Sequence, residues 1–411
     1  MTHEHFDCLI VGGGHAGAEA AITLRATGFA GSIGLLGNEA VHPYERPALS
    51  KEYLAGKKSL DQLLLRPTEY WAEHDVDLRL SVHVVGVDTD NKTVTCDDGT
   101  MVGYGSLVWA AGGSPRRLDC PGHDLNGIHA IRDMADCDRL MSALPQSRRI
   151  AVIGGGFIGL EAAAVLRELG KEVAIIEALD RFLARVAAEP VSRFYENEHR
   201  DRGVSVHLGT GVAEILGHDG EVTGVRLTDG TVIDADQVIV GIGIIPAIQP
   251  LLTAGAEATA GSTGVLIDDH CRTSLPDVYC VGDCAVLREG PGIRIESRQN
   301  AIEQAQTAAK AISGQAEALN MVPWFWSNQY DLRLKTIGLS LGYDQTVLRG
   351  DPESRSFSLI YLKRGAVIAM DCINATRDYM QGRRLVETGA HVDAAILADA
   401  QTPLKEVAAA I

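Results

Sequence analysis

The sequence predicts an α/β protein with two doubly wound, Rossmann-like dinucleotide-binding domains and a small α+β domain at its C-terminal end. A repeat supports this prediction: an apolar strand, a glycine turn and an alanine-rich helix occupy residues 7–21 and again 150–163. Each copy leads to a further apolar strand that ends in glycine, at 106–112 and at 237–243. Short apolar strands of this kind are typical of parallel sheets buried on both faces. With 411 residues, the chain is also long enough for several domains.

The order of these patterns predicts three domains. The first is discontinuous and takes residues 1–114 and 244–322, the second takes 115–243, and the third takes 323–411. The third is richer in strand-forming and aromatic residues, and we expect it to contain a helix near Asp393–Leu397.

The composition disfavours several classes of protein. The 37 basic and 54 acidic residues give a net charge of −17, which argues against a nucleic-acid-binding protein. No apolar run is long enough to span a bilayer and no cleavable signal is recognised, so we expect a cytoplasmic protein without a membrane partner. The eight cysteines are scattered and form no C-x-x-C pair, no C-x4-C pair of a flavin disulfide reductase and no cluster-binding run. We therefore expect reduced structural thiols and no metal site.

The first glycine motif is Gly12-x-Gly14-x-x-Gly17, between an apolar strand and a helix. Glycines let the backbone approach a pyrophosphate, and the start of the helix offers free N–H groups to it. An acidic residue about 20 positions further on normally holds the adenosine ribose. The candidates there are Asn38 and Glu39, and the residues alone do not choose between them.

The second motif is Gly154-x-Gly156-x-x-Gly159, and its following strand ends at Glu177. A carboxylate at this position accepts hydrogen bonds from a ribose 2′-hydroxyl and repels a 2′-phosphate, so it favours NADH over NADPH. The alternative is a solvated glutamate at the end of a strand, and Arg181 nearby weakens the discrimination.

A third signal distinguishes the two nucleotides. An apolar strand at residues 278–281 ends in Gly282-Asp283, and a helical stretch is expected to follow. An aspartate there accepts a hydrogen bond from a ribityl hydroxyl, and the helix directs its positive end at the flavin ring. Downstream of two dinucleotide motifs, this pattern indicates that the first domain binds FAD and the second binds NADH.

With these residues in view, the whole chain resembles the single-component ferredoxin reductases of the putidaredoxin reductase and rhodocoxin reductase type. The most specific matching stretches are Pro43–Lys51, Gly154–Glu161, Thr273–Asp283, Ile295–Ser297 and Pro323–Ser327. The resemblance implies a glutathione-reductase-like fold. It also implies hydride transfer from NADH to FAD and release of single electrons to a separate [2Fe–2S] ferredoxin, which supplies a haem-thiolate monooxygenase (cytochrome P-450 type) or a Rieske dioxygenase.

The resemblance also implies roles for individual residues. Lys51 would pair with Glu161 beside flavin N5, where a cation stabilises the reduced flavin, and these two are the candidate catalytic residues. The candidate FAD-binding residues are Gly12, Gly14, His15, Ala16, Gly17, Asn38, Glu39, Arg46, Lys51, Val82, Ala111, Gly112, Arg132, Gly282, Asp283 and Trp326. The candidate NAD-binding residues are Gly154, Gly156, Phe157, Ile158, Gly159, Glu177, Arg185, Gly241, Ile242, Gly243 and Glu296. The ferredoxin would dock near Trp324, Arg377, Arg383 and Arg384.

Several of these residues also have a purely structural interpretation. Lys51 is also explained as an exposed lysine at a helix start, and Glu161 as a carboxylate that favours the helix dipole. His15 is more often a spacer in such a turn, and the tryptophans at 324 and 326 are also explained as strand residues on one face. Family members usually carry an acidic residue where this chain has Asn38, and Thr-Gly where it has Ala111-Gly112, which leaves the ribose contact open.

Two alternative functions remain at this point. A disulfide reductase, NADH oxidase or peroxidase on the same fold needs a reactive cysteine near the flavin, and none lies around Leu49–Leu54. A redox-sensing interaction protein that resembles apoptosis-inducing factor would turn over slowly and bind a partner instead.

Overall fold

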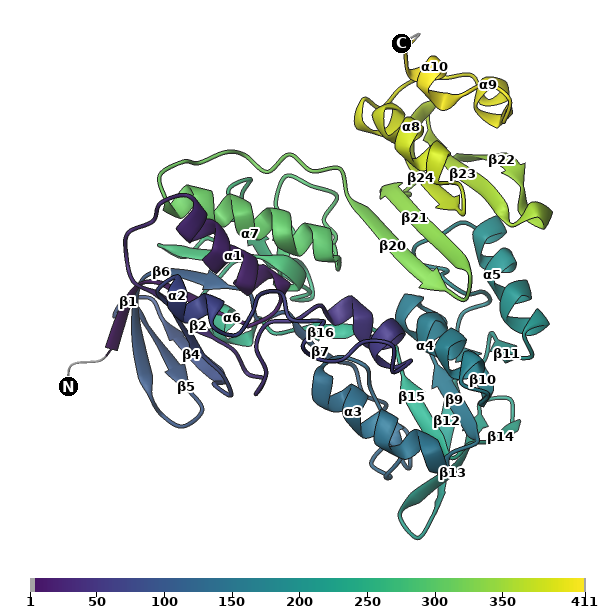
Figure 1. Cartoon of the computed structure of the whole chain (residues 1–411), viewed down its shortest axis with the longest axis horizontal. Coiled ribbons are helices and arrows are strands. Elements are labelled where there is room, and N and C mark those ends of the chain that lie inside the picture. The colour runs from purple at the N-terminus through teal and green to yellow at the C-terminus, as the bar shows by residue number, and fades with distance from the viewer. Residues whose placement is uncertain (1–3, 410–411) are drawn as a thin grey trace. The chain divides into compact units, whose positions relative to one another are not determined.

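The computed structural model describes residues 4–409, which divide into two compact units. Unit 1 contains the described residues up to Ala48, together with Lys58–Ser114 and Ile244–Met321. Unit 2 contains Leu49–Lys57, Pro115–Gly243 and the described residues from Val322 onward. The helices and strands of both units are labelled in Figure 1.

Unit 1 is built on a seven-stranded sheet of order β3-β2-β1-β6-β5-β4, in which β18 also pairs with β6. Its strands are β1 (Glu4–Val11), β2 (Ile33–Leu36), β3 (Val76–Arg79), β4 (Val84–Asp88), β5 (Thr93–Cys96), β6 (Met101–Trp109) and β18 (Val278–Cys280). β1 is parallel to β2 and β6, whereas β4 and β5 add an antiparallel meander. The apolar strand β1 is central, so that its residues from Cys8 to Val11 are buried.

Helices and short strands complete unit 1. They are α1 (His15–Ala26), α2 (Tyr70–Glu73), β7 (Gly113–Pro115), β16 (Ile244–Pro246), α6 (Gln249–Thr253), β17 (Val265–Ile267), β19 (Ala285–Leu287) and α7 (Arg298–Ile312), with 3₁₀ turns at Arg46–Ala48 and Gly282–Cys284. α1 and α7 lie side by side (Figure 1), joined by a 2.7 Å hydrogen bond from Gln306 to Glu19. Small alanines on both helices permit this close packing.

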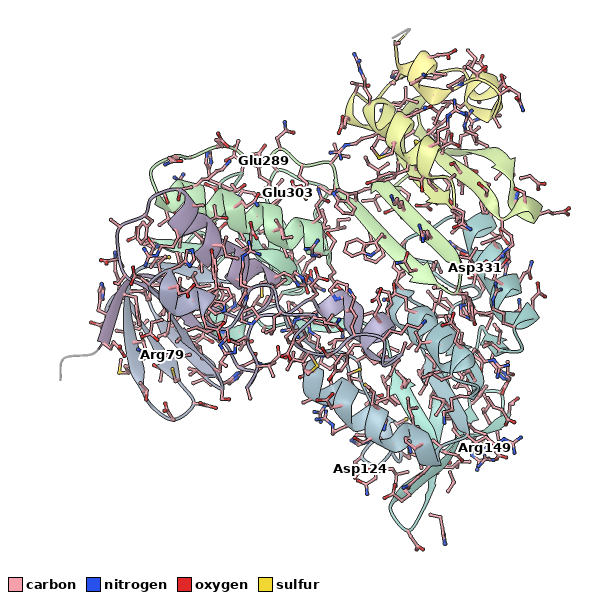
Figure 2. All side chains as sticks on the ribbon, viewed as in Figure 1. Arg79, Asp124, Arg149, Glu289, Glu303 and Asp331 are labelled. Atoms are coloured by element: carbon pink, nitrogen blue, oxygen red, sulfur yellow. The ribbon has the colours of Figure 1, made fainter. Side chains whose placement is uncertain are left out.

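Unit 2 contains a second parallel sheet, of order β11-β10-β9-β15-β8. Its elements are β8 (Ile128–His129), α3 (Met134–Ala143), a 3₁₀ turn (Leu144–Gln146), β9 (Arg149–Ile153), α4 (Phe157–Glu168), β10 (Glu172–Glu177), α5 (Glu189–Asp201), β11 (Ser205–Leu208) and β15 (Gln237–Val240). The antiparallel strands β12 (Val212–His218), β13 (Glu221–Leu227) and β14 (Val232–Asp234) form a separate sheet. Arg149, labelled in Figure 2, pairs with Asp234 at 2.9 Å and Asp236 at 2.7 Å and so ties β9 to the end of this sheet.

Unit 2 also contains an antiparallel sheet of order β20-β21-β24-β23-β22. Its strands are β20 (Trp324–Gln329), β21 (Leu332–Gly338), β22 (Gln345–Asp351), β23 (Ser356–Lys363) and β24 (Ala366–Ile373), followed by α8 (Thr376–Glu387), α9 (Ala394–Ala398) and α10 (Leu404–Ala409), with a 3₁₀ turn at Pro352–Ser354. The helices pack an apolar face against this sheet, around Met370 and Leu385. The segment Leu49–Lys57 adds an interrupted helical turn at Leu49–Tyr53.

The predicted fold class is confirmed by these sheets and by the structural comparisons reported below. The helix expected near Asp393–Leu397 is α9, with Asp393 as its N-cap, but α8 was not expected. The strands predicted at 106–112 and 237–243 end earlier, at Trp109 and Val240. The domain boundaries stay a prediction, because the two units are defined by packing and not by cofactors. Within residues 4–409, no helix combines the length and apolar character needed to cross a membrane.

Candidate functional site

The first glycine turn is shaped by contacts that a side chain would block. Gly12 has φ = +116°, and a Cβ atom on it would lie 2.2 Å from the carbonyl oxygen of Ala110. A Cβ atom on Gly17 would lie 1.8 Å from the oxygen of Gly12. Helix α1 begins after Gly14 without a side-chain cap and without an acidic residue in its first turn. Its free N–H groups and positive dipole end therefore suit an anion such as a pyrophosphate.

The second glycine turn repeats this geometry in unit 2. Gly154 has φ = +110°, and a Cβ atom on it would lie 2.4 Å from the oxygen of Gly241. A Cβ atom on Gly159 would lie 2.2 Å from the oxygen of Gly154. Helix α4 begins after Gly156, again with no side-chain cap and no acidic residue in its first turn. The sequence repeat is therefore a repeat of backbone geometry.

Glu177 lies over the second turn, as the spacing predicts. Its Oε2 accepts a 2.6 Å hydrogen bond from the N–H of Gly155, and its Oε1 accepts one of 2.8 Å from Leu179. The carboxylate is fixed by these bonds and keeps lone pairs for ribose hydroxyls. Arg181 points elsewhere, because its guanidinium donates to the carbonyl of Ala187 and to other atoms of that loop.

Unit 1 has a different residue at the matching position. In each turn the N–H of the first glycine donates at 2.8 Å to one strand carbonyl, that of Leu36 in unit 1 and Ile176 in unit 2. The next residue is Glu177 in unit 2 but Gly37 in unit 1. No carboxylate therefore stands at the end of β2.

The two ribose candidates of unit 1 lie just beyond that position. Asn38 is exposed. Glu39 forms an ion pair with Arg46, and its Oε2 accepts a 2.6 Å hydrogen bond from the hydroxyl of Tyr44. Which of the two contacts the ribose stays a prediction.

Positive charge gathers beside the first turn. A Cβ atom on Gly14 would lie 3.7 Å from Nε of Arg46. His15 is only 8% exposed, and its Nε2 has no hydrogen-bond partner among the described residues. Burial, with the positive charges of Arg298 and Arg46, lowers the pKa of His15 to about 3. A cradle that excludes side chains, beside two guanidinium groups and an unpartnered ring nitrogen, fits the pyrophosphate of a dinucleotide.

The structure corrects the expectation at Gly282-Asp283. These residues form a three-residue 3₁₀ turn that leads into β19, and no α-helix follows until α7 starts at Arg298. The following helix therefore does not begin at Asp283. Gly282 has φ = +71° and donates its N–H to Gln304 at 2.7 Å, which fixes the turn.

The remaining FAD candidates are divided between the units. Val82 donates its N–H to Gly37 at 2.8 Å, so its carbonyl is the group left for a ligand. Gly112 has φ = +64° and follows the half-buried Ala111. Lys51, Arg132 and Trp326 belong to unit 2, and the other FAD candidates belong to unit 1.

The NAD candidates lie in unit 2, apart from one. Phe157, the first residue of α4, packs its ring 4.6 Å from that of Phe325, whereas Ile158 is 47% exposed. Arg185 is exposed, and the run from Gly241 to Gly243 follows β15. Glu296 belongs to unit 1, where it pairs with Arg294 at 2.8 Å.

Lys51 and Glu161 form a buried ion pair within unit 2. Nζ of Lys51 lies 2.6 Å from Oε2 of Glu161, and the two side chains are 11% and 3% exposed. The pairing implied by the family resemblance is therefore present, and an exposed lysine at a helix start is excluded. Removal of either partner would leave a buried charge without its counter-charge.

Two serines that sequence reasoning missed also hold Glu161. Ser50 donates to Oε2 at 2.6 Å, and Ser327 donates to Oε1 at 2.7 Å. The helical turn Leu49–Tyr53 is interrupted at Lys51, where φ is −130° and ψ is −106°. This interruption lets two consecutive side chains reach one carboxylate, which a regular helix would direct about 100° apart.

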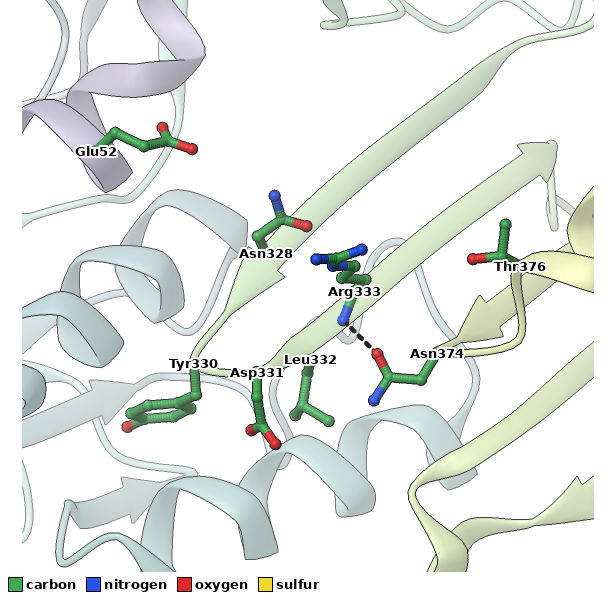
Figure 3. Close-up of a pocket in the computed structure, with 8 residues that line it drawn as sticks. All are labelled: Glu52, Asn328, Tyr330, Asp331, Leu332, Arg333, Asn374 and Thr376. Carbon is green, nitrogen blue, oxygen red and sulfur yellow. Dashed lines mark hydrogen bonds between the residues drawn. The ribbon is translucent and has the colours of Figure 1, made fainter. Parts of the chain in front are cut away.

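A hollow of about 500 Å³ opens beside the hairpin β20–β21 of unit 2. Figure 3 shows Asn328 and Arg333 next to each other on the two strands, where they are paired in register. A second hollow of about 120 Å³ is lined by Lys51 and Glu161. The ion pair therefore borders a space that admits water.

No described cysteine offers a reactive thiolate near this pair. All eight cysteines are free, and seven of them are buried. Cys137 is the thiol that approaches the interrupted turn, 3.4 Å from the carbonyl of Leu49, and burial raises the pKa of this thiol to about 12. A protonated single thiol does not perform disulfide exchange.

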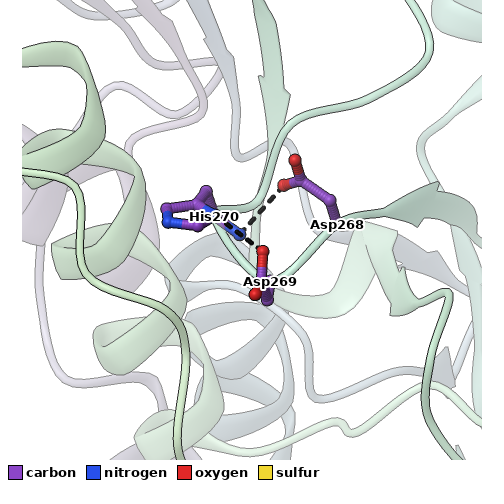
Figure 4. Close-up of side chains that lie close together, drawn as sticks. All are labelled: Asp268, Asp269 and His270. Atoms are coloured by element: carbon purple, nitrogen blue, oxygen red, sulfur yellow. Dashed lines mark hydrogen bonds and ion pairs between the residues drawn. The ribbon is translucent and has the colours of Figure 1, made fainter.

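One cluster in unit 1 has side chains of metal-ligand type. Asp268, Asp269 and His270 converge on a turn (Figure 4), with their ligand atoms within 4.8 Å of one another. Asp268 accepts hydrogen bonds from the N–H groups of His270 and Arg272, and Asp269 contacts the His270 ring at 2.6 Å. These contacts fasten the turn and account for the convergence.

Comparisons with known proteins cover nearly the whole chain. Residues 6–311 match the family described as pyridine nucleotide-disulphide oxidoreductases, and residues 324–408 match a reductase C-terminal family. A Sphingobium protein named as the ferredoxin reductase subunit of 5,5'-dehydrodivanillate O-demethylase is 54% identical over 99% of each chain. Putidaredoxin reductase of Pseudomonas putida is 38% identical over 98% of this chain and 96% of its own. The solved structure of the covalent putidaredoxin reductase–putidaredoxin complex superposes with a TM-score of 0.94 at 37% identity, over 100% of this chain and 99% of that chain.

Proposed function

The chain belongs to the pyridine nucleotide-disulphide oxidoreductase family, and from this premise we propose that it is an FAD-dependent NADH:ferredoxin reductase. It passes single electrons to a separate [2Fe–2S] ferredoxin, which supplies a haem-thiolate monooxygenase or a Rieske dioxygenase. The resemblance to putidaredoxin and rhodocoxin reductases is confirmed by relatives of both names, each 38% identical. The name of the Sphingobium relative supports an oxygenase system as the final acceptor.

The observation that carries the proposal is the buried pair of Lys51 and Glu161 in a turn without a cysteine pair. A disulfide reductase or a thiol peroxidase needs a reactive cysteine at the flavin. Here the turn offers a fixed cation instead, so electrons leave without a thiol intermediate. Each NADH supplies two electrons, so two ferredoxins are reduced and one proton is released.

The two glycine turns divide the cofactors between them. The turn at Gly12, with Arg46 and His15 beside it, holds the pyrophosphate of FAD, and Asp283 holds its ribityl chain. The turn at Gly154 holds NADH, and Glu177 binds its adenosine ribose and repels the 2′-phosphate of NADPH. The remaining candidate residues keep the roles assigned to them from the sequence.

The residues of the chain prepare the reaction without a general base. Bound FAD supplies the acceptor for a hydride and divides its two electrons. Nζ of Lys51 donates to Glu161 at 2.6 Å and to Ser50 at 3.4 Å, and these two contacts fix the position of the cation. A cation held in place before the reaction stabilises the negative charge that develops near it.

Helix α8 supports a docking site for an acidic ferredoxin. Arg377 and Arg384 are exposed, seven positions apart on one face, and Met380 between them is 67% exposed. Arg383 pairs with Glu387 at 2.6 Å, so its charge is partly compensated. Two arginines around an exposed apolar side chain suit electrostatic steering toward a hydrophobic contact. Trp324 completes the set of residues predicted for docking.

A cytoplasmic location belongs to the same proposal. It is supported by the eight free cysteines, because thiols stay unpaired in a reducing compartment.

The function is tested by the NADH-driven reduction of cytochrome c with and without a [2Fe–2S] ferredoxin. A rate that depends on the ferredoxin concentration is expected. Equal rates without ferredoxin, or rapid peroxide formation from oxygen, would support an oxidase instead.

A further inference from the structure

A chain of hydrogen bonds in unit 2 runs from the half-buried Tyr330 to Glu161. The hydroxyl of Tyr330 lies 3.0 Å from Nδ1 of His199, and Nε2 of His199 lies 3.0 Å from the amide oxygen of Gln329. The amide nitrogen of Gln329 then donates to Ser327 at 3.4 Å, and Ser327 donates to Oε1 of Glu161 at 2.7 Å. Ser327, Gln329 and Tyr330, which are neighbours in sequence, are joined in this way to His199 and to Glu161.

In this chain of hydrogen bonds, each residue donates to the next one in the direction of Glu161. An ionised carboxylate only accepts, so the hydroxyl of Ser327 donates to it and accepts from the amide of Gln329. The amide oxygen of Gln329 requires a proton on Nε2 of His199, which leaves Nδ1 to accept from Tyr330. His199 is neutral in this arrangement, since burial lowers its pKa to about 4. The partners thereby assign both the histidine tautomer and the amide orientation.

The inner residues of this hydrogen-bond chain are buried, so that each of them needs its protein partner. Ser327 and His199 are fully buried, and Gln329 and Glu161 are nearly so. A buried polar group that loses its partner is not rescued by water. Lys51 and Ser50 occupy Oε2 of Glu161, whereas Ser327 is the described partner of Oε1.

Tyr330, the outermost residue of this hydrogen-bond chain, lies at the tip of the hairpin β20–β21, where other side chains fix it. The guanidinium of Arg202 lies 4.3 Å above the Tyr330 ring, and it pairs with Asp331 at 3.0 Å. Asp331, labelled in Figure 2, also pairs with Arg355 at 2.6 Å. Tyr330 and Asp331 border the hollow shown in Figure 3. The chain therefore connects an anchored surface turn with the buried ion pair.

We propose that Ser327 is a positioning residue, supported by Gln329, His199 and Tyr330, that holds Oε1 of Glu161 and so keeps Oε2 turned toward Lys51. The proposal rests on the proposed function, in which this ion pair acts at the flavin. This chain of hydrogen bonds does not conduct protons, because the amide group of Gln329 interrupts the proton path. Its effect is to fix a dipole whose positive end faces the carboxylate.

The test compares Ser327→Ala with wild type as FAD-loaded protein. A hydrogen bond to a charged group changes an equilibrium by roughly tenfold or more. Without this bond Oε2 of Glu161 is held less firmly against Lys51, and we therefore expect flavin reduction by NADH, followed by stopped-flow absorbance, to slow roughly tenfold. Loss of the dipole also makes the site more negative, so the equilibrium of bound FAD with a redox dye shifts roughly threefold toward oxidised flavin. Ser327→Thr, which keeps the hydroxyl, restores both values.

Two further variants distinguish an effect on the position of Glu161 from a general loss of folding stability. Ser358→Ala is the matched control, because Ser358 is also fully buried on the same sheet and donates to a carboxylate, that of Asp378 at 3.0 Å. It should change neither readout. Tyr330→Phe removes only the outermost hydroxyl and should shift both readouts in the direction of Ser327→Ala, by less.

Glu161→Gln distinguishes failure of this proposal from failure of the proposed function. If Glu161→Gln slows flavin reduction while Ser327→Ala and Tyr330→Phe leave both readouts unchanged, the positioning role is overturned and the function stands. If Glu161→Gln itself changes nothing, the ion pair does not act at the flavin. A Ser327→Ala effect that Ser358→Ala reproduces would also overturn the proposal.

Discussion

The two glycine turns share one backbone but present different side chains. Where unit 2 has Glu177 at the end of its strand, unit 1 has Gly37, and where unit 2 starts its helix with Phe157, unit 1 has His15. The shared part suits what any dinucleotide has, a pyrophosphate. In the proposed function, these differences decide which dinucleotide each turn accepts.

The charged side chains around the two glycine turns also differ. Unit 1 places Arg46 and Arg298 beside its turn, whereas unit 2 places the fixed carboxylate of Glu177 over its own. Guanidinium groups favour a permanently held anionic cofactor. A single carboxylate selects a ribose with free hydroxyls and permits exchange of the coenzyme.

The largest effect is expected from alanine at the last glycine of each turn. Gly17→Ala drives a Cβ atom into the oxygen of Gly12 and should abolish FAD retention, measured as flavin absorbance per protein. Gly159→Ala should keep FAD but weaken NADH binding by more than about 100-fold. Gly211→Ala, whose Cβ atom would meet Thr228 at an ordinary 3.5 Å, is the control. Loss of FAD from Gly159→Ala would reverse the assignment of the turns.

Lys51→Met should slow reduction of bound FAD by NADH roughly 100-fold, because the fixed cation is lost and Glu161 keeps an unpaired charge. Stopped-flow absorbance of the flavin measures this rate. Lys57→Met is the matched control in the same segment, since Lys57 is 66% exposed and pairs weakly with Glu168 at 3.5 Å. An unchanged rate for Lys51→Met would remove this residue from the reaction.

Glu177→Gln should lower the preference for NADH over NADPH roughly tenfold, because the charge that repels a 2′-phosphate is lost. The ratio of kcat/KM for the two coenzymes, with a dye as acceptor, measures this preference. Glu172→Gln, at the exposed start of the same strand, should leave the ratio unchanged. A wild-type protein that uses NADPH equally well would refute the role of Glu177.

The smallest expected effect is on stability, and it comes from His15, which takes the position in unit 1 that Phe157 has in unit 2. The pKa of His15 is lowered in the folded protein from 6.5 to about 3, so below pH 6.5 the unfolded chain binds a proton that the folded chain does not. The apoprotein should therefore lose roughly 1 kcal/mol of stability per pH unit through this group as the pH falls from about 6 toward 4. His15→Phe should remove that slope in urea unfolding, whereas His218→Phe, at an 83% exposed side chain, should not. An identical slope in His15→Phe would contradict the burial argument.

Much of this comparison could be predicted from local sequence. The glycine turns follow from spacing, because steric limits act on adjacent residues, and Glu177 follows because β10 ends on it. The same spacing pointed to Asn38 and Glu39 in unit 1, but β2 ends at Leu36 and the matching position is Gly37. Counting residues does not locate the end of a strand.

The contacts around Glu161 could not be predicted in this way. Ser50 and Ser327 lie 111 and 166 residues from it in the chain, and nothing local marks either serine as its partner. The helix expected after Asp283 was wrong for a related reason: residues Ala285–Leu287 pair with β17, and this pairing prevails over the local pattern. Tertiary contacts decide such cases.

In the proposed function, electrons leave the flavin singly to a ferredoxin. The most direct measurement mixes FAD-loaded protein and an excess of oxidised [2Fe–2S] ferredoxin with limiting NADH under anaerobic conditions, and follows both chromophores. We predict that two ferredoxins are reduced for each NADH consumed. A flavin that becomes reduced while the ferredoxin stays oxidised would show that the protein is not a ferredoxin reductase.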